Sequence, residues 1–258
     1  MNKTNKKYKI FVFRAIDEPE LCEKYLEGHI RVLTDYGITN VSTNNSKWIN
    51  HPYIYCAVAQ DMDDKNFVGG VRIQISDGIH PLPVESAIGG LDETIYDKVK
   101  EYALKGGISE SCGLWTAKSV KGIGIARYLM RASIASSDQL GFNKMLGICG
   151  WHTMKLFNQI GFLVDKSLGE NGDFPYPTDE HIANVIGILD AVTLKNATKS
   201  EQKIMLDIRN IQTLSRNETS EKFNIEVSYS IKYPKIMDGP FLDEENYDIE
   251  TLKNYKIY

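Results

Sequence analysis

A glycine-rich turn, KGIG at residues 121–124, stands between an apolar stretch and a long helical pattern that begins at Ile125. Gly122 and Gly124 allow the backbone to approach another group closely and to adopt positive φ angles. Such a turn between a strand and a helix presents free N–H groups at the positive end of the helix dipole, which favours a phosphate or a pyrophosphate. The spacing therefore predicts either an anion-binding turn or a tight turn that binds nothing.

Two common anion-binding motifs do not fit this turn. A Walker A loop requires GxxxxGK[ST], which the chain lacks, and a dinucleotide fingerprint requires a third glycine where Arg127 stands. The remaining pattern, [QR]xxGx[GA], fits residues 119–124 except at its first position, which is Ser119.

With this pattern the chain resembles the GNAT superfamily of acyl-CoA-dependent N-acyltransferases over roughly residues 8–192. LWTAKSV leads into KGIGIARYLM as the cofactor strand of that family leads into its pyrophosphate loop and helix, and LFNQIGF is similar to its second signature. The resemblance implies an α/β (α+β) fold with a mixed, mostly antiparallel central sheet flanked by helices. It also implies transfer of an acetyl group from acetyl-CoA, or of another acyl group from acyl-CoA, to a primary amine.

The resemblance assigns two consecutive segments to the cofactor. The backbone at the end of the strand would pair with the pantetheine arm and stabilise the oxyanion, and the following turn would hold the pyrophosphate. The residues concerned are Trp115, Thr116, Ala117, Lys121, Gly122, Ile123, Gly124, Ile125 and Ala126. The five histidines show no metal-binding spacing, so no metal is expected.

Three positions depart from the pattern of the family: Ser119, Gly150 and Phe157. Phe157 stands where many members carry a tyrosine that protonates the departing thiolate, and phenylalanine cannot donate a proton. Cys149, His152 or solvent would then take over this step. A protein that binds acyl-CoA without turning it over remains an alternative.

A side branch of the superfamily, the acyl-homoserine-lactone and N-acyl amino acid synthases, takes acyl chains from acyl-CoA or acyl carrier protein. VGGVRIQ followed by PLPVESAI is similar to a stretch of that branch, so a longer-chain donor is a second possibility. Glu110 falls near an acidic residue that those enzymes use around the amine, and strand alternation places it on the same face as Thr116. We expect Glu110 to be the base, with Glu85 in the loop PLPVESAI as the second choice.

Composition excludes several other classes of protein. A net charge of −4 gives no indication of nucleic acid binding, and the four cysteines are too widely spaced for a zinc site or a secreted disulfide scaffold. The basic start is followed by too few apolar residues for a signal peptide, and no run is long enough for a membrane span. We expect a cytoplasmic protein whose partners are a small-molecule or protein amine and, for the second donor, acyl carrier protein.

Periodicity predicts a domain at residues 1–192 and a C-terminal extension at residues 193–258, which is either packed on the domain or a partner-binding tail. Expected strands cover 8–16, 54–60, 66–76, 108–117, 144–150, 184–192, 223–233 and a segment from Phe162. Expected helices cover 19–37, 92–107, 122–141, 152–162 and 200–212.

Overall fold

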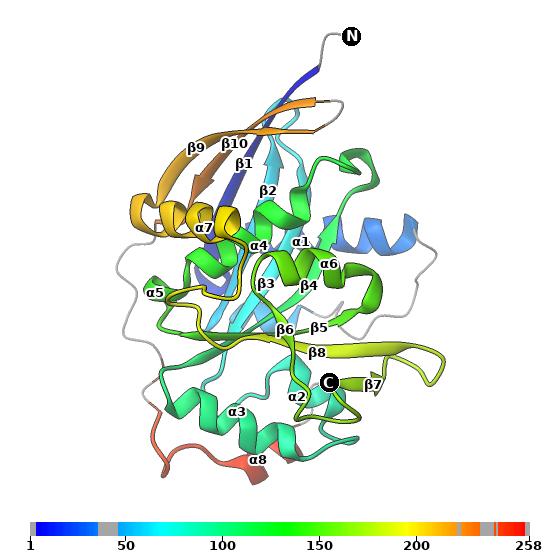
Figure 1. Ribbon diagram of the computed structural model, residues 1–258, viewed down its shortest axis with the longest axis vertical. Helices are drawn as coiled ribbons and strands as arrows, with labels where there is room; N and C mark the ends of the chain where they lie inside the picture. The colour runs from blue at the N-terminus through cyan, green and yellow to red at the C-terminus, as the bar shows by residue number, and fades with distance from the viewer. Residues whose placement is uncertain (1–3, 36–45, 221–222, 233–239, 241, 256–258) are drawn as a thin grey trace. The chain divides into compact units, whose positions relative to one another are not determined.

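The computed structural model describes residues 4–35, 46–220, 223–232, 240 and 242–255. Helices flank a mostly antiparallel sheet, which confirms the expected mixed α/β class (Figure 1). In the part of the chain that the structure describes, no helix is both long and apolar enough to cross a membrane.

The chain forms two compact units, and each is discontinuous in sequence. The first contains residues 1–73, 113–136 and 204–234, and the second contains residues 74–112, 137–203 and 235–258. Strands β3 (Phe67–Ile75) and β4 (Ile108–Thr116) contribute residues to both units.

The strands of the first unit follow the order β4-β3-β2-β1-β10-β9. Strand β1 runs antiparallel to β2 and parallel to β10, so that the blue and the orange-brown strands of Figure 1 lie side by side. Tyr8, Ile10 and Val12 of β1 are buried in alternation, and helix α4 packs against β1 and β2. The remaining elements of this unit are β1 (Thr4–Arg14), α1 (Pro19–Asp35), β2 (Ile54–Asp61), α4 (Ile125–Ala135), β9 (Thr213–Thr219), β10 (Phe223–Ser230) and the second half of α7 (Lys199–Ile211).

In the second unit β4 begins parallel to β5, and β5 runs antiparallel to β8, which also pairs with β6 and β7. One hydrophobic core joins Val84 and Ile88 of α2, Ile95 and Val99 of α3, and Leu146 of β5. The elements are α2 (Pro83–Ile88), α3 (Thr94–Leu104), α5 (Ser137–Leu140), β5 (Lys144–Gly150), α6 (Met154–Gln159), β6 (Leu163–Val164), β7 (Asp173–Pro175), β8 (Ile182–Ile188) and α8 (Ile249–Asn254).

Two local expectations were wrong. The helix expected to reach Gly141 ends at Ala135, where the hydroxyls of Ser133 and Ser136 bond to carbonyls one turn earlier, and such bonds weaken or bend a helix. Most of the stretch PLPVESAI forms helix α2 and not a loop. Pro83, the first residue of the helix, and Glu85, the third, both favour a helix start.

The C-terminal part of the chain contains more regular structure than its composition indicates. Strands β7 and β9 and helix α8 are short elements that the periodicity does not predict. Pairing of β10 with β1 supports a packed extension over a free tail for residues 223–230, whereas the domain boundary at residue 192 stays a prediction. Gly37, expected to close the first helix, lies outside the described residues.

Candidate active site

Strand β4 changes direction in its middle. Its ladder with β5 covers Ile108–Glu110, and Gly113 then adopts a φ of 60°. Tyr25 of α1 donates a hydrogen bond of 2.8 Å from its hydroxyl to the carbonyl of Gly113, which fixes this kink. The kink separates the start of β4 from the end that the sequence assigns to the pantetheine arm.

The side chain of Trp115, after the kink, belongs to the core. It is 4% exposed, stacks on His29 at a centroid distance of 6.5 Å and meets Tyr25 edge-on at 5.8 Å. Thr116 and Ala117 are half-buried, and the amide of Ala117 donates to a carbonyl of β3. At Trp115 only the backbone is therefore left for contact with a cofactor.

The glycine turn follows β4 and ends at the N-terminus of α4. Gly122 has a φ of 82°, and Gly124, with a φ of 99°, is the N-cap residue of α4 and has no side chain to cap the helix. The first helical bond runs from the amide of Tyr128 to the carbonyl of Gly124. The amides of Ile125 and Ala126 precede that bond, so helix geometry gives them no partner within the helix.

The rest of the turn is held by its own hydrogen bonds. The amides of Lys121 and Ile123 donate to the carbonyls of residues 118 and 120, and the hydroxyl of Tyr128 donates to the carbonyl of Ile123 at 2.9 Å. Lys121, Gly122 and Gly124 are exposed. A side-chain carbon added at Gly122 would meet nothing within 4 Å. A turn held by its own hydrogen bonds, with open space beside Gly122 and a helix dipole behind it, suits an anionic group.

The second unit brings Glu85 and Glu110 together at the start of α2. The Oε2 atom of Glu85 accepts a hydrogen bond of 2.7 Å from the amide of Leu82. The Oε2 atom of Glu110 accepts one of 2.6 Å from the amide of Val84. The two glutamates are 1% and 2% exposed. Both carboxyl groups thus bind the N-terminal turn of one helix, where the dipole favours negative charge.

Glu85 differs from an ordinary buried acid in one respect. Its Oε1 atom is buried and has no hydrogen-bond partner among the described residues. The pKa of Glu85 is raised to about 8: burial is the main cause, the charges of Glu110 and Asp77 add to it, and the hydrogen bond from the Leu82 amide opposes it. A carboxyl group that titrates close to neutral pH and has one free oxygen is a candidate proton acceptor.

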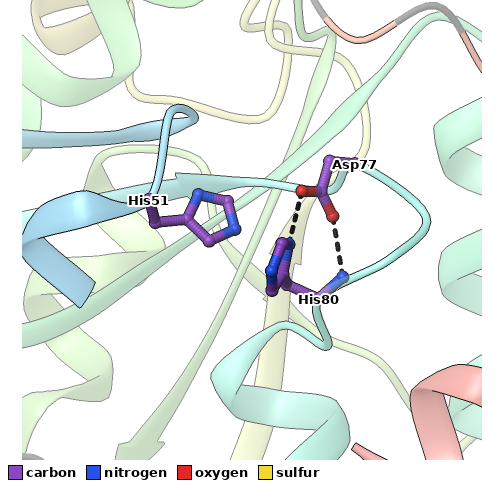
Figure 2. A group of neighbouring side chains, drawn as sticks. All are labelled: His51, Asp77 and His80. Atoms are coloured by element: carbon purple, nitrogen blue, oxygen red, sulfur yellow. Dashed lines mark hydrogen bonds and ion pairs between the residues drawn. The ribbon is translucent and has the colours of Figure 1, made fainter. Parts of the chain in front are cut away.

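A third acid lies in the loop between β3 and α2. Asp77 is 7% exposed, accepts the amides of Ile79 and His80, and holds Nδ1 of the His80 ring at 2.7 Å (Figure 2). The hydrogen bond with Asp77 raises the pKa of His80. Gln74 fastens the other end of the loop by donating to the carbonyl of Pro81 at 3.0 Å.

The residues considered for protonating the leaving group lie at the end of β5, in the 3-10 turn Trp151–Thr153 and in α6. Phe157 is a core residue that meets Phe162 edge-on at a centroid distance of 5.2 Å, so this position supplies no proton. Burial raises the pKa of the Cys149 thiol, which therefore stays protonated at neutral pH. His152 is exposed.

Several residues around the acid pair carry no motif in the sequence. Asp77 and His80 have only the local signal of an acid that caps the turn after it. Tyr247 is buried in the second unit, and its hydroxyl lies 3.1 Å from Oγ of Ser76 across a separation of 171 residues. No local pattern predicts a contact over such a separation.

The fold is similar to that of several solved structures, among them an N-acyl amino acid synthase and an acyl-homoserine lactone synthase. FeeM, an N-acyl amino acid synthase from uncultured soil microbes, matches with a TM-score of 0.55 and 12% identity over 77% of this chain and 99% of that chain. TofI, in a ternary complex with an inhibitor and MTA, gives 0.54 and 13% over 76% and 96%. BjaI, a CoA-dependent acyl-homoserine lactone synthase with SAM and isopentyl-CoA, gives 0.52 and 12% over 90% and 96%.

Comparison at the level of sequence adds nothing to this likeness. No protein-family model matches the chain, and no curated protein matches it. At 12–13% identity the structural likeness establishes the fold. The resemblance to the acyl-homoserine-lactone and N-acyl amino acid synthase branch is confirmed at that level.

Proposed function

We propose that this protein is an N-acyltransferase that moves an acyl group from a CoA thioester to a primary amine by direct attack. The observation that carries the proposal is the buried carboxyl pair Glu85 and Glu110, with its one unpartnered oxygen, in a fold shared with acyltransferases. The glycine turn in the other unit is the donor half of the proposal.

For the donor, we assign the pyrophosphate to the amides of Gly122, Gly124, Ile125 and Ala126. The turn is exposed there and lies at the positive end of α4. Lys121 adds positive charge beside the phosphates, and its own amide already serves the turn. Backbone groups from Trp115 to Ala117 pair with the pantetheine arm and stabilise the oxyanion, except for the Ala117 amide, which already bonds to β3.

For the acceptor, the carboxyl pair binds the amine as an ammonium ion. Glu110 holds the cation, and the Oε1 atom of Glu85 takes one proton from it, leaving a neutral amine and a protonated Glu85. The amine nitrogen then forms a bond with the thioester carbon, the bond from carbon to sulfur breaks, and the nitrogen releases its second proton to solvent. With a pKa of about 8, Glu85 is ionised in part near neutral pH, and only this ionised fraction accepts the proton.

The thiolate that leaves must acquire a proton. Because Phe157 has none to give, we assign this step to the Cys149 thiol or to solvent. The raised pKa of Cys149 keeps its thiol protonated at neutral pH and disfavours a nucleophilic thiolate, which agrees with direct transfer.

The acyl chain of the donor separates two versions of the proposal. In the first version the donor is acetyl-CoA, as the resemblance to the GNAT superfamily implies. The fold likeness to BjaI, solved with isopentyl-CoA, supports a longer chain carried by CoA, and acyl carrier protein is the other carrier of this second version.

Thermal unfolding with acetyl-CoA, free CoA and a long-chain acyl-CoA tests the donor half. A ligand at about 100 times its dissociation constant stabilises the folded state by roughly 2.7 kcal/mol, and we expect a raised Tm. A shift with acetyl-CoA selects the acetyl donor, and a shift confined to the long chain selects the second version. No shift with any CoA compound would remove CoA as the donor.

A further inference from the structure

The C-terminal segment, residues 242–255, is fastened to the second unit by charged side chains. Lys253 pairs with Glu93 at 2.8 Å, and Lys100 pairs with Glu244 at 3.1 Å. Lys100 also donates to the backbone carbonyl of Tyr247 at 3.2 Å. These contacts hold the segment against helix α3 and the residue before it.

Two side chains of the segment enter the core beneath these ion pairs. Leu252 and Tyr247 are 2% and 3% exposed and belong to the apolar cluster that includes Val84 and Ile88 of α2. Glu85 lies between these two residues in the sequence of α2. The ring of Tyr247 therefore packs in the apolar surroundings of the helix that carries Glu85.

Tyr247 also closes on the loop that carries Asp77. Its hydroxyl lies 3.1 Å from Oγ of Ser76, and a side-chain carbon added at Gly78 would lie 3.1 Å from both the Tyr247 ring and Leu242. Gly78 has a φ of 74°. Such close approach of a ring to the backbone requires glycine at this position.

The titratable groups that interact electrostatically with Glu85 come from four places in the second unit: Glu110 and Asp77 raise its pKa, and its charge in turn raises the pKa of Tyr96 and Tyr247. Glu110 lies on β4, Asp77 on the loop after β3, Tyr96 on α3 and Tyr247 on the C-terminal segment. Burial raises the pKa of Tyr247, and the charges of Glu85 and Asp77 raise it further, so the phenol is neutral. Tyr247 thus contributes bulk and one hydroxyl without adding charge.

We propose that Tyr247 is a wall of the acceptor site, which excludes water from Glu85 and limits the size of the amine that reaches it. The proposal rests on the proposed function, because it takes Glu85 as the proton acceptor. It makes the C-terminal segment a part of the site and Tyr247 a positioning residue for Glu85. The acceptor class that follows is a small primary amine without bulk next to its nitrogen on this side.

The first test follows the titration of Glu85 directly, by carboxyl carbon NMR of the full chain, with Glu85→Gln to assign the signal. Tyr247→Leu removes the aromatic ring and admits water. It should lower the pKa of Glu85 by about one unit or more, because burial is the main cause of the raised pKa. Tyr247→Phe keeps the ring and should leave the titration unchanged. Tyr255→Phe, which removes a hydroxyl from the same segment, is the matched control.

An unchanged titration in folded Tyr247→Leu would overturn the wall. Should this variant not fold, Tyr247→Met supplies the same loss of the ring with a more adaptable side chain, and the same outcomes apply. This readout needs no turnover. A wild-type chain without acyl transfer would therefore contradict the proposed function, while the titration still decides on the wall.

The second readout is the size of amine that the enzyme accepts. Tyr247→Leu should raise kcat/KM for an amine with a bulky substituent relative to methylamine by about tenfold or more, since a filled pocket discriminates by this order. Tyr247→Phe should leave the ratio unchanged. Equal ratios in wild type and folded Tyr247→Leu would contradict a limit on amine size.

Discussion

Gly124→Glu is expected to weaken binding of acyl-CoA by at least about 100-fold, which corresponds to roughly 2.7 kcal/mol. The new carboxylate would stand at the N-cap of α4, where a pyrophosphate carries charge of the same sign. Its side chain would start 3.2 Å from the hydroxyl of Tyr128, and the backbone φ of 99° is strained for any residue but glycine. Titration calorimetry with CoA measures the effect.

Two control variants separate charge, strain and unfolding. Gly124→Ala keeps the strained backbone without the charge and should cost part of the affinity. Gly90→Glu adds a carboxylate at an exposed glycine that has nothing within 4 Å of its added carbon, and it should bind CoA as the wild type does. Wild-type affinity in a folded Gly124→Glu chain would remove the turn from the donor site.

Glu85→Gln is expected to lower kcat by about 100-fold or more while leaving the thermal shift with acyl-CoA unchanged, because the amide cannot accept the proton. Glu110→Gln should also lower turnover, and it should raise KM for the amine because the ammonium ion loses the carboxylate that binds it. The sequence places Glu110 before Glu85 as the base, whereas the free oxygen and the raised pKa of Glu85 support the opposite order. Full activity of Glu85→Gln would contradict this assignment.

Glu85→Gln should also change how the free energy of unfolding depends on pH, an effect that does not require catalysis. The pKa of Glu85 is about 8 in the folded chain and 4.5 as its ordinary value, so between these pH values the folded state holds a proton that the unfolded state has released. The resulting stabilisation is complete below pH 4.5 and is lost as the pH rises through 8. Urea unfolding at pH 5, 7 and 9 should show Glu85→Gln gaining on the wild type by a few kcal/mol as pH rises. A constant difference between the two proteins would mean that Glu85 titrates normally.

The sequence predicts the helices and strands of the chain where one buried face gives the apolar residues a regular spacing. The hairpin of β2 and β3 and the helices α1 and α3 follow from alternation, from helical spacing and from the turn residues between them. Strand β9 reads TLSRNET and carries no such period, because its structure comes from pairing with β10. Helix α2 has only six residues, and the proline at its first position and the glutamate at its third are its only local signs.

The residues of the candidate site also fall into those that a local sequence pattern predicts and those that depend on distant contacts. The glycine turn is local, so the spacing of Gly122 and Gly124 was enough to find it. The raised pKa of Glu85 is not a local property, because the group is buried in the second unit and the charges that add to the shift come from Glu110 on β4 and Asp77 on the loop after β3. Residue types alone named both glutamates, and only the structure shows which of them has a free oxygen.

The most direct test of the account is the release of CoA thiol from acyl-CoA as a function of added primary amine, with mass spectrometry of the amine. Direct transfer predicts that thiol release rises with amine concentration and that the amine gains the mass of the acyl group minus one hydrogen. The donors should include acetyl-CoA, a long-chain acyl-CoA and an acyl carrier protein thioester. Absence of amine-dependent release with all three donors, across small primary amines, would contradict an N-acyltransferase.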